Sequence, residues 1–432
     1  MANALRPRLL ASCAALLALA ELALAADHFV GPGHPHADVS SAIAAAAPGD
    51  RIFVAPGLYP GFDLSKPVEI RGAGVGQTRI GSWVSTARTT VTGIPAGSTA
   101  TLANMSFDPA WYLTQTFGPQ LTLVDNPGTV LLQDVGTNLF PTAWHIGTGV
   151  EVDNTARLLI QGSTIEAIST AGFPTEGVPA LVAKDSFLEV TDSVFVATAS
   201  GVEWGTPGED GVRLENCTAR FARVRSSGGN GTSDDFFDGP GGAGVKLIGS
   251  TLELAGGPEN RLEGGSALSL GGPGLDVTAS SAVVMAGDVE LEGGTPWGSS
   301  TPSSSLRVDG SSSSVALAHA LPALVPAQSL VSLGGPWSLS HTGDPGALVI
   351  PVLGASLGAP LVLPGFGGFA QLDLGQLGFL PTLSLDGAGQ AVSAGLVPNQ
   401  ASLAGAHAWF QAAEVAGGVL SLSNATRLAI AN

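Results

Sequence analysis

A repeated pattern in the middle of the chain constrains the possible fold more than any other feature of the sequence. Each copy contains alternating apolar residues, a turn residue four places after the first of them, and then a second apolar pair. Successive copies start 29, 31, 31, 33, 23 and 38 residues apart. A strand, a bend and another strand that recur about every 30 residues predict a coil whose turns stack in parallel. The copies start at Leu121, Val150, Leu181, Val212, Val245, Leu268 and Leu306.

The turn position of this repeat is always occupied by Asp, Asn or Gly. These residues tolerate a left-handed backbone, so the position is predicted to have a positive φ in every copy. The position after it usually carries a small side chain, which explains Cys217 as a stacked residue without a nucleophilic role. The turn residues are Asp125, Asn154, Asp185, Asn216, Gly249, Gly272 and Gly310.

The segment before the repeat predicts a short helix followed by strands. Asp38 can cap the helix, and Pro48-Gly49 ends it. Such a helix would cover the unpaired strand edges at the open end of the coil. Its apolar face comprises Val39, Ala42, Ile43 and Ala46. The strands that follow are predicted at 52–54, 62–64 and 68–70.

This opening also resembles a known superfamily. The stretch AIAAAAPGDRIFVAPGLYPG, followed by KPVEIRGAG, is similar to the start of secreted right-handed parallel β-helix proteins of the pectate-lyase-like superfamily, which includes pectate lyases, pectin methylesterases and polygalacturonases. The resemblance continues through the repeat, from Asp27 to Leu317. It implies an all-β fold with a right-handed parallel β-helix over residues 27–321. It does not select an activity, because this fold carries lyases, hydrolases, adhesins and inert stalks.

The pattern changes at about Pro322. Apolar and polar residues then alternate between Gly, Pro and Asn turns, and the turn position of the repeat is absent. This predicts a small antiparallel β-sandwich over residues 322–432. The stretches LPTLSLDGAGQAVSAGLVPNQASLAGAHAWFQA and LSLSNATRLAI resemble a recurrent C-terminal module of large secreted bacterial proteins. That resemblance implies no particular activity.

Residues 1–26 are predicted to be a secretory signal peptide. Arg6 and Arg8 precede an apolar stretch, and Ala23-Leu24-Ala25 is a small-x-small cleavage signal. Cleavage would also remove Cys13, leaving one cysteine and therefore no intrachain disulfide. We expect a protein that is secreted or held at the cell-envelope surface.

Charge and hydropathy exclude some partners. After cleavage, 15 basic and 34 acidic side chains would remain, and their formal charge of −19 repels nucleic acids and anionic membranes. The apolar run 347–370 contains three prolines and five glycines, so we interpret it as core strands and expect no transmembrane segment. Extracellular polysaccharides, cell-surface glycans and cations remain as partners.

The stretch TSDDFFDG, between the fourth and fifth copies of the repeat, contains the strongest candidate for chemistry. Asp234, Asp235 and Asp238 crowd together on a glycine-rich excursion and would suit calcium, which takes oxygen ligands from flexible loops. With Arg223 as a base, Asp234 and Asp235 could form a catalytic site like that of a lyase. However, the Arg-x-Pro-x-x-Arg pattern of pectate lyases is absent, and so are the polygalacturonase motifs other than the Asp pair. A solvated acidic loop is the alternative.

Two other groups of residues suggest binding. Glu203 and Trp204 lie on the preceding excursion, and with Phe236 they could line an acidic, aromatic groove for sugars. The alternative is that these aromatic rings pack against their own loops. His28, His34 and His36 cluster near the start, where a His-x-His pattern suits a transition metal, although an ordinary surface segment explains them too.

Three functions therefore remain open. The first, which we favour, is a non-catalytic extracellular or envelope-associated β-helix that serves as a scaffold or surface protein, for example in adhesion. The second is a polysaccharide lyase or glycoside hydrolase that acts near Asp234, Asp235 and Arg223. The third is a calcium-dependent or glycan-binding module without turnover. No cofactor is expected apart from calcium.

Overall fold

The computed structural model describes most of the chain from residue 25 to residue 431. The ranges are 25–81, 88–108, 116–137, 145–169, 177–198, 206–232, 239–255, 260–268, 270–285, 289–297, 301–316, 322–328, 330–361, 366–367, 370–373, 375, 377–403 and 406–431.

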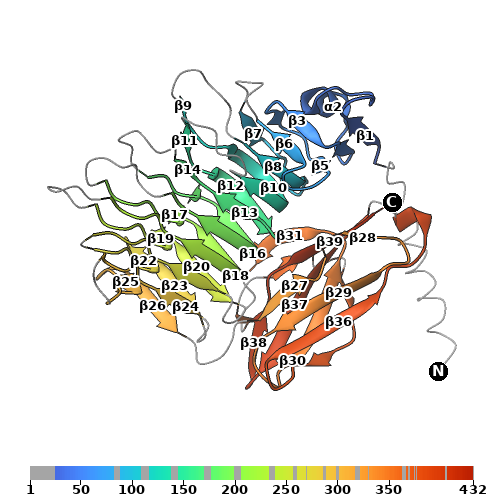
Figure 1. The fold of residues 1–432 in the computed structure, drawn as a ribbon. Helices are drawn as coiled ribbons and strands as arrows, with labels where there is room; N and C mark the ends of the chain where they lie inside the picture. The colour runs from blue at the N-terminus through green and yellow to red at the C-terminus, as the bar shows by residue number, and fades with distance from the viewer. Residues whose placement is uncertain are drawn as a thin grey trace, which may run out of the picture.

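The first three quarters of these residues form a parallel β-helix (Figure 1). Register pairs divide its strands into three parallel ladders, which we name A, B and C. Long strands bend at a corner and take part in more than one ladder; β10, for example, pairs in all three. The prediction of an all-β chain with a parallel β-helix is confirmed.

Ladder A contains β1 (Asp27–Val30), β2 (Arg51–Val54), β5 (Glu69–Gly72), β8 (Thr99–Phe107), β10 (Leu121–Thr137), β12 (Val150–Gln161), β16 (Phe187–Val196), β18 (Thr218–Ser227), β20 (Thr251–Ala255), β23 (Ala282–Met285) and β26 (Ser313–Ala316). Ladder B adds β3 (Gly57–Tyr59), β6 (Thr78–Ile80), β13 (Thr164–Glu166), β21 (Arg261–Glu263) and β24 (Glu290–Glu292). Ladder C adds β4 (Asp63–Leu64), β7 (Thr89–Thr92), β15 (Leu181–Lys184), β17 (Val212–Glu215), β19 (Val245–Ile248), β22 (Leu275–Thr278) and β25 (Leu306–Val308). A small separate sheet contains β9 (Thr116–Phe117), β11 (His145–Gly147) and β14 (Ile168–Ser169).

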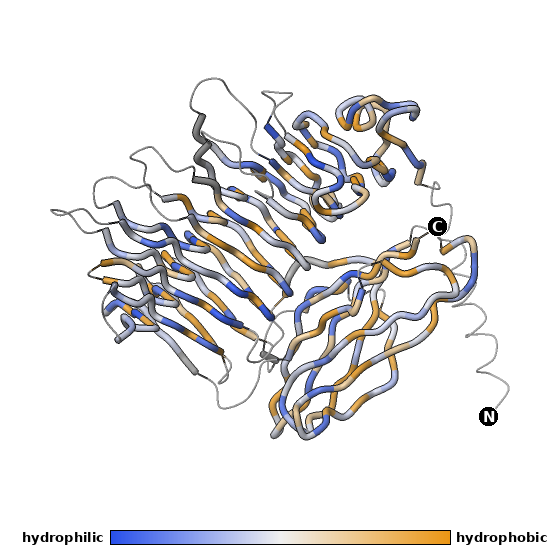
Figure 2. Tube along the Cα trace, in the orientation of Figure 1, coloured by the Kyte–Doolittle hydropathy of each residue, from blue (hydrophilic) through white to orange (hydrophobic). Residues whose placement is uncertain are grey.

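The apolar residues that alternate along each strand point into the coil. They form one continuous core that extends from Val30 to Met285. Figure 2 shows the alternation as orange and blue bands along the strands. Since each coil covers the apolar residues of its neighbours, stacking supplies the burial that a single coil cannot provide.

The corner between ladders C and A is the predicted turn position. Its φ angles are 52°, 48°, 47°, 53° and 61° in the first five copies, which confirms the prediction there. Gly272 and Gly310 do not have a positive φ, so the prediction is wrong in the last two copies. The sixth coil starts at Leu275, which pairs with Val245 and with Leu306, and its left-handed residues are Ala279 and Ser280. The first five turn residues are Asp125, Asn154, Asp185, Asn216 and Gly249.

A layer of glycines between ladders B and C explains the misplaced sixth copy. Gly272 belongs to this layer, in which glycines of successive coils hydrogen-bond to one another at N to O distances of 2.8 to 2.9 Å. A Cβ on Gly265 would lie only 1.9 Å from the Gly229 carbonyl oxygen. Glycine is therefore required by close backbone packing at these positions. The hydrogen-bonded series is Gly229, Gly242, Gly265, Gly272 and Gly294.

Small side chains after the turn connect the coils from the inside. The backbone N–H of Cys217 donates to Ser250 Oγ at 2.9 Å, and the N–H of Ser250 donates to Ser281 Oγ at 3.0 Å. Cys217 is 3% exposed, and burial raises the pKa of its thiol to about 11. It is thus a stacked residue in this series, as the repeat indicates, and its thiolate is disfavoured.

A short helix closes the N-terminal end, as predicted. Helix α2 (Val39–Ala45) begins after Asp38, whose side chain accepts a 2.7 Å hydrogen bond from the Ser41 N–H. Lys66 Nζ donates to the carbonyls of Ile43 and Ala46, at 2.7 and 2.9 Å, where the helix ends. These contacts satisfy backbone groups at both helix termini.

From Ala323 onward the chain forms mostly antiparallel sheets. The first contains β27 (Ala323–Pro326), β29 (Pro336–Thr342) and β36 (Gln390–Leu396). The second contains β28 (Leu330–Val331), β39 (Thr426–Ile430), β37 (His407–Ala416), β30 (Leu348–Gly354), β34 (Leu377–Phe379), β32 (Phe366–Gly367), β35 (Leu383–Ser384) and β38 (Val419–Leu422). A pair of strands, β31 (Leu357–Leu361) and β33 (Ala370–Leu372), and the 3-10 helix η2 (Ala401–Leu403) complete it.

The two C-terminal sheets share an apolar core. Leu324 and Leu339 from the first sheet pack with Phe410 and Leu428 from the second. The expectation of antiparallel sheets is confirmed, and the apolar run 347–370 contains strands, as expected. No helix among the described residues is long and apolar enough to cross a membrane.

Candidate binding cleft between the coils and the C-terminal sheets

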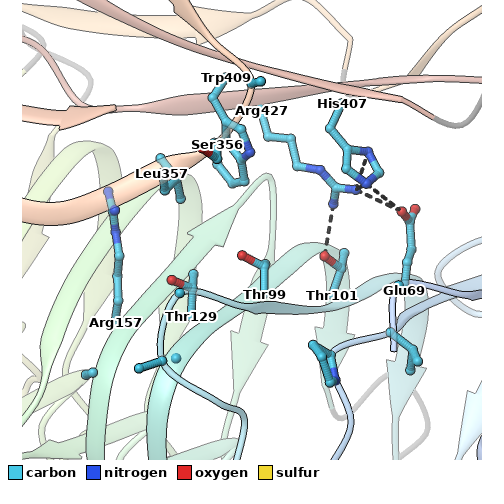
Figure 3. Close-up of a pocket in the computed structure, with 18 of the residues that line it drawn as sticks. Glu69, Thr99, Thr101, Thr129, Arg157, Ser356, Leu357, His407, Trp409 and Arg427 are labelled. Carbon is cyan, nitrogen blue, oxygen red and sulfur yellow. Dashed lines mark hydrogen bonds and ion pairs between the residues drawn. The ribbon is translucent and has the colours of Figure 1, made fainter. Parts of the chain in front are cut away.

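The C-terminal sheets lie along the outer face of ladder A (Figure 1), and a cleft of about 380 Å³ remains between them. We name it the junction cleft. Figure 3 shows the side chains that enter it from both sides. The coils contribute Arg51, Glu69, Thr99, Thr101, Thr129 and Arg157, among others. The C-terminal part contributes Ser356, Leu357, His407, Trp409 and Arg427.

The floor of the junction cleft comes from outward-facing positions of neighbouring coils. Thr99 pairs with Thr129, and Glu69 pairs with Thr101. In a parallel ladder, paired residues stack on one face, so hydroxyl groups are repeated along the coil axis. The floor therefore carries the Thr99 and Thr129 hydroxyls side by side, while Leu131 and Leu159 continue the row of Thr101 on the same outer face.

A buried ion cluster closes one end of the cleft. Glu69 accepts hydrogen bonds from Arg71 at 2.7 Å and from Arg427 at 2.8 Å, and Arg427 also donates to Thr101 Oγ1 at 3.0 Å. Burial alone would raise the pKa of Glu69, but Arg427 and Arg71 outweigh it and hold the pKa at about 2. Glu69 is therefore a fixed anion and cannot supply a proton near neutral pH.

His407 extends this cluster toward the opening. Its Nδ1 lies 2.7 Å from Arg427 Nη2, and its Nε2 lies 3.7 Å from a Glu69 carboxylate oxygen. Burial and the charge of Arg427 lower the pKa of His407 to about 3. The imidazole is consequently neutral at neutral pH, and its Nδ1 can accept the hydrogen bond from Arg427.

A second buried cluster lies at the other end. Glu189 accepts hydrogen bonds from Gln371 Nε2 at 3.1 Å and from the Ala425 N–H at 2.8 Å. Arg157 lies 3.6 Å from the Glu189 carboxylate and also hydrogen-bonds Gln371. Further along, Arg220 donates to the Leu422 and Pro322 carbonyls at 2.6 and 2.8 Å. The C-terminal sheets are thus attached through polar groups at both ends of the cleft.

Apolar contacts lie between the two clusters. Leu131 and Leu159, on the outer face of ladder A, pack with Leu372 and Trp409. Trp409 is 4% exposed, so most of its ring is engaged in this contact while one part lines the cleft. Only a small part of the ring is therefore open to a ligand.

The described lining of the junction cleft lacks a pair of carboxyl groups. Among the described residues that line the cleft, Glu69 is the only carboxylate, and its ion pairs hold it deprotonated. Glycoside hydrolysis ordinarily requires two carboxyl groups, one of which is a proton donor. Threonine and serine hydroxyls, arginine and tryptophan instead match the groups that recognise sugar hydroxyls and rings.

Most residues predicted from the sequence as sites lie outside the described residues. These are Glu203, Trp204, Asp234, Asp235, Phe236 and Asp238. The calcium, catalytic and sugar-binding roles suggested for them therefore stay predictions. In the described part of the chain, no group of three or more His, Cys, Asp or Glu side chains has the arrangement of a metal site.

Arg223 is described. It occupies the corner between ladders A and B with a φ of 57°, and its guanidinium pairs with Asp192 at 2.9 Å. The described ends of the excursion that carries Asp234 lie at a different corner. Thr232 and Gly239 are between ladders B and C. The structure brings Arg223 together with Asp192, a partner that the sequence did not indicate.

Sequence reasoning did not find the junction cleft. Glu69 and Arg427 are separated by 358 residues, and His407 has no carboxylate at ligand spacing in the sequence. One signal was present: KPVEIRG places Glu69 and Arg71 at alternate positions of a strand, on the same outward face. Charged residues on the outside of a coil are common, so this signal alone does not reveal a partner.

Comparisons with known proteins add little to this picture. No protein-family model and no curated protein matches the sequence. Among solved structures, the full-length tailspike protein 2 of an Escherichia coli O157:H7 bacteriophage matches with 11% identity and a TM-score of 0.30, over 95% of this chain and 69% of that one. The enzymatically active domain of tailspike protein 2 from bacteriophage CBA120 matches with 9% identity and a TM-score of 0.22, over 89% and 66%.

A chitinase from Paenibacillus sp. str. FPU-7, described as a cell-surface-expressed multi-modular enzyme, also matches. Its identity is 14% and its TM-score is 0.16, over 88% of this chain and 23% of that one. At these scores the likenesses carry no argument about activity, so function rests on the site itself.

Proposed function

We propose that this protein is an extracellular β-helix protein that binds a polysaccharide or cell-surface glycan in the junction cleft without cleaving it. The observation that carries the proposal is the lining of the cleft. Its floor places the hydroxyls of Thr99 and Thr129 on neighbouring coils, and Trp409 and Arg157 flank that floor. The secretory signal predicted for residues 1–26 supports a location outside the cell.

The shape of the site supports an extended ligand. A glycan presents hydroxyls at regular intervals, and stacked coils present donors and acceptors at intervals of about 4.8 Å, the spacing of neighbouring strands. Thr99 and Thr129 are partly exposed and are available to such a ligand, whereas Thr101 is occupied by Arg427. The three arginines of the described lining are each ion-paired, Arg51 with Asp27, Arg157 with Glu189 and Arg427 with Glu69, so the local charge favours neutral sugars over carboxylated ones.

A steric variant tests the proposal. Thr129→Trp would fill the floor of the cleft, while Thr122→Trp places the same ring on the same strand, β10, at a partly exposed position of ladder C. We expect a panel of neutral and uronate-containing glycans to give saturable binding, at least about tenfold weaker in Thr129→Trp and unchanged in Thr122→Trp. Equal loss in both variants, or no binding by the native protein, would refute the assignment of the cleft.

Product analysis separates binding from catalysis. The same glycans, incubated with the protein with and without calcium, should yield no new reducing ends and no unsaturated uronates. Degradation that Asp235→Ala abolishes would instead establish the lyase or hydrolase alternative at the Asp234 excursion. Degradation that survives this substitution but disappears in Thr129→Trp would make the junction cleft an active site.

A further inference from the structure

Two histidines near the start of the described chain face each other across a gap of unusual length. His28 is in strand β1, and His36 pairs with Val30 through an isolated bridge after the chain turns back. The distance from His28 Nδ1 to His36 Nε2 is 3.4 Å, which is longer than the 2.7 to 3.2 Å of an ordinary N–H hydrogen bond. Two nitrogen ligands bound at about 2.0–2.1 Å across a tetrahedral angle lie about 3.4 Å apart.

A buried carboxylate orients this pair. The Nε2 atom of His28 lies 3.1 Å from Asp50 Oδ2, a contact that favours the tautomer with the proton on Nε2 and leaves the lone pair of Nδ1 on the side of His36. Asp50 is itself held by the backbone N–H group of Ala47 at 2.8 Å, a contact that the predicted signal cleavage leaves in place. A carboxylate that fixes the tautomer and orientation of a histidine is the usual outer partner at a metal-ligating imidazole.

The pair is also accessible. The His28 side chain is 16% exposed, and His36 is partly exposed, so solvent can supply the remaining ligands. His34, on the same turn, does not join the pair, because its ring stacks on Phe29. The arrangement thus offers two nitrogen ligands, an oriented tautomer and an open side.

We propose that His28 Nδ1 and His36 Nε2 bind a divalent transition-metal ion, zinc in the first instance, with Asp50 as the positioning residue and water completing the coordination. Such an ion would join strand β1, the turn that follows it and the corner before β2, at the end of the coil where no further described coil packs. Metal binding to the folded chain alone would stabilise this end. The proposal is independent of the junction cleft and of any glycan.

The experiment uses protein without a histidine tag. Titration with zinc chloride, followed by calorimetry, should show one ion per chain and a rise in melting temperature. Cobalt(II) in place of zinc should develop the visible absorption of a tetrahedral site. His28→Gln and His36→Gln, which keep a polar side chain of similar size, should each abolish saturable binding. Asp50→Asn should weaken it by about tenfold to a hundredfold.

His34→Ala is the matched control. It removes a histidine from the same turn and should leave the stoichiometry and affinity for zinc unchanged. Circular dichroism of each variant checks that the coil is folded. No zinc binding by the native protein, or an equal loss in His34→Ala and His36→Gln, would overturn the proposal. Glycan binding that persists in His36→Gln would show that the proposed metal site and the junction cleft act independently.

Discussion

The inside and the outside of ladder A are built from the same strands but are held together by different forces. Inside, Leu132, Leu158 and their neighbours stack in an apolar core that continues from coil to coil. Outside, Glu69 and Glu189 pair with arginines and with backbone groups of the C-terminal sheets. The interior can be extended by adding coils, whereas the outer face fits one partner in one place. The repeated apolar positions therefore build the coil. The buried ion pairs determine where the C-terminal sheets bind to it.

The largest expected effect comes from breaking the ion cluster. Glu69→Ala leaves Arg427, which is 1% exposed, as a buried cation without its main carboxylate partner. Loss of one member of a buried pair ordinarily costs about 3–5 kcal/mol. We expect the C-terminal sheets to unfold or separate first in guanidinium, which would appear as an early, separate transition in tryptophan fluorescence.

Glu215→Ala is the control for this prediction. Its ion pair with Lys184 lies at the surface, where such pairs contribute about 0–1 kcal/mol. If both substitutions shift the unfolding midpoint equally, the buried cluster is not what holds the C-terminal sheets.

The glycine layer offers the next effect in size. Gly265→Ala places a Cβ 1.9 Å from the Gly229 carbonyl oxygen, which forces neighbouring backbone to move. Overpacking of this kind costs about 1–3 kcal/mol. Gly310→Ala is the comparison, because no atom lies within 4 Å of its Cβ and its φ is not positive. Melting temperatures should fall for the first variant and stay level or rise slightly for the second.

A smaller effect should come from a charge buried inside the C-terminal sheets. Burial raises the pKa of Glu414 to about 7, and among the described residues its Oε2 has no hydrogen-bond partner. Because the pKa of Glu414 is higher in the folded state, this residue adds to the stability of the protein at pH values below 4.5, its ordinary pKa. This contribution is lost as the pH rises to about 7. Glu414→Gln should therefore stabilise the protein by about 1 kcal/mol above pH 7.

Stability measured across pH checks this sign. The difference between Glu414→Gln and the native chain should shrink steadily from pH 7 to pH 4.5. Glu69 and His407 act in the opposite direction, because their pKa values of about 2 and 3 lie below the ordinary values, so their contributions are lost as pH falls. A His407→Gln chain that loses stability between pH 6.5 and pH 4 as steeply as the native chain would contradict the assigned state of His407.

The smallest effect should be at Cys217. Cys217→Ser puts a hydroxyl where neighbouring coils already carry Ser186 and Ser250, so stability should change by less than about 1 kcal/mol. The native thiol should also resist alkylation at pH 8, because its pKa is about 11. Rapid labelling of the folded protein would show that Cys217 is more accessible and more acidic than the series of stacked residues implies.

The coil could be predicted because its signals are local. Alternation of apolar residues and a left-handed residue such as Asn154 act within a few positions, and stacking only repeats them. The prediction failed where two local signals competed: the glycines around Gly272 imitate a turn, although they form a packed layer. The spacing of 30 and 31 residues from Val245 to Leu275 and then to Leu306 removes the apparent irregularity.

By itself, the sequence determined the parallel β-helix, its closing helix and the change to antiparallel sheets, since periodicity and turn residues encode them. Only the tertiary structure decided where those sheets dock and which charges meet. Glu69 and Arg427, 358 residues apart, pair because the sheets lie against one face of ladder A. His28 and His36 face each other because a turn folds back beside Asp50. Contacts of this kind depend on how segments that are distant in the sequence pack together, and no local pattern of residues predicts that packing.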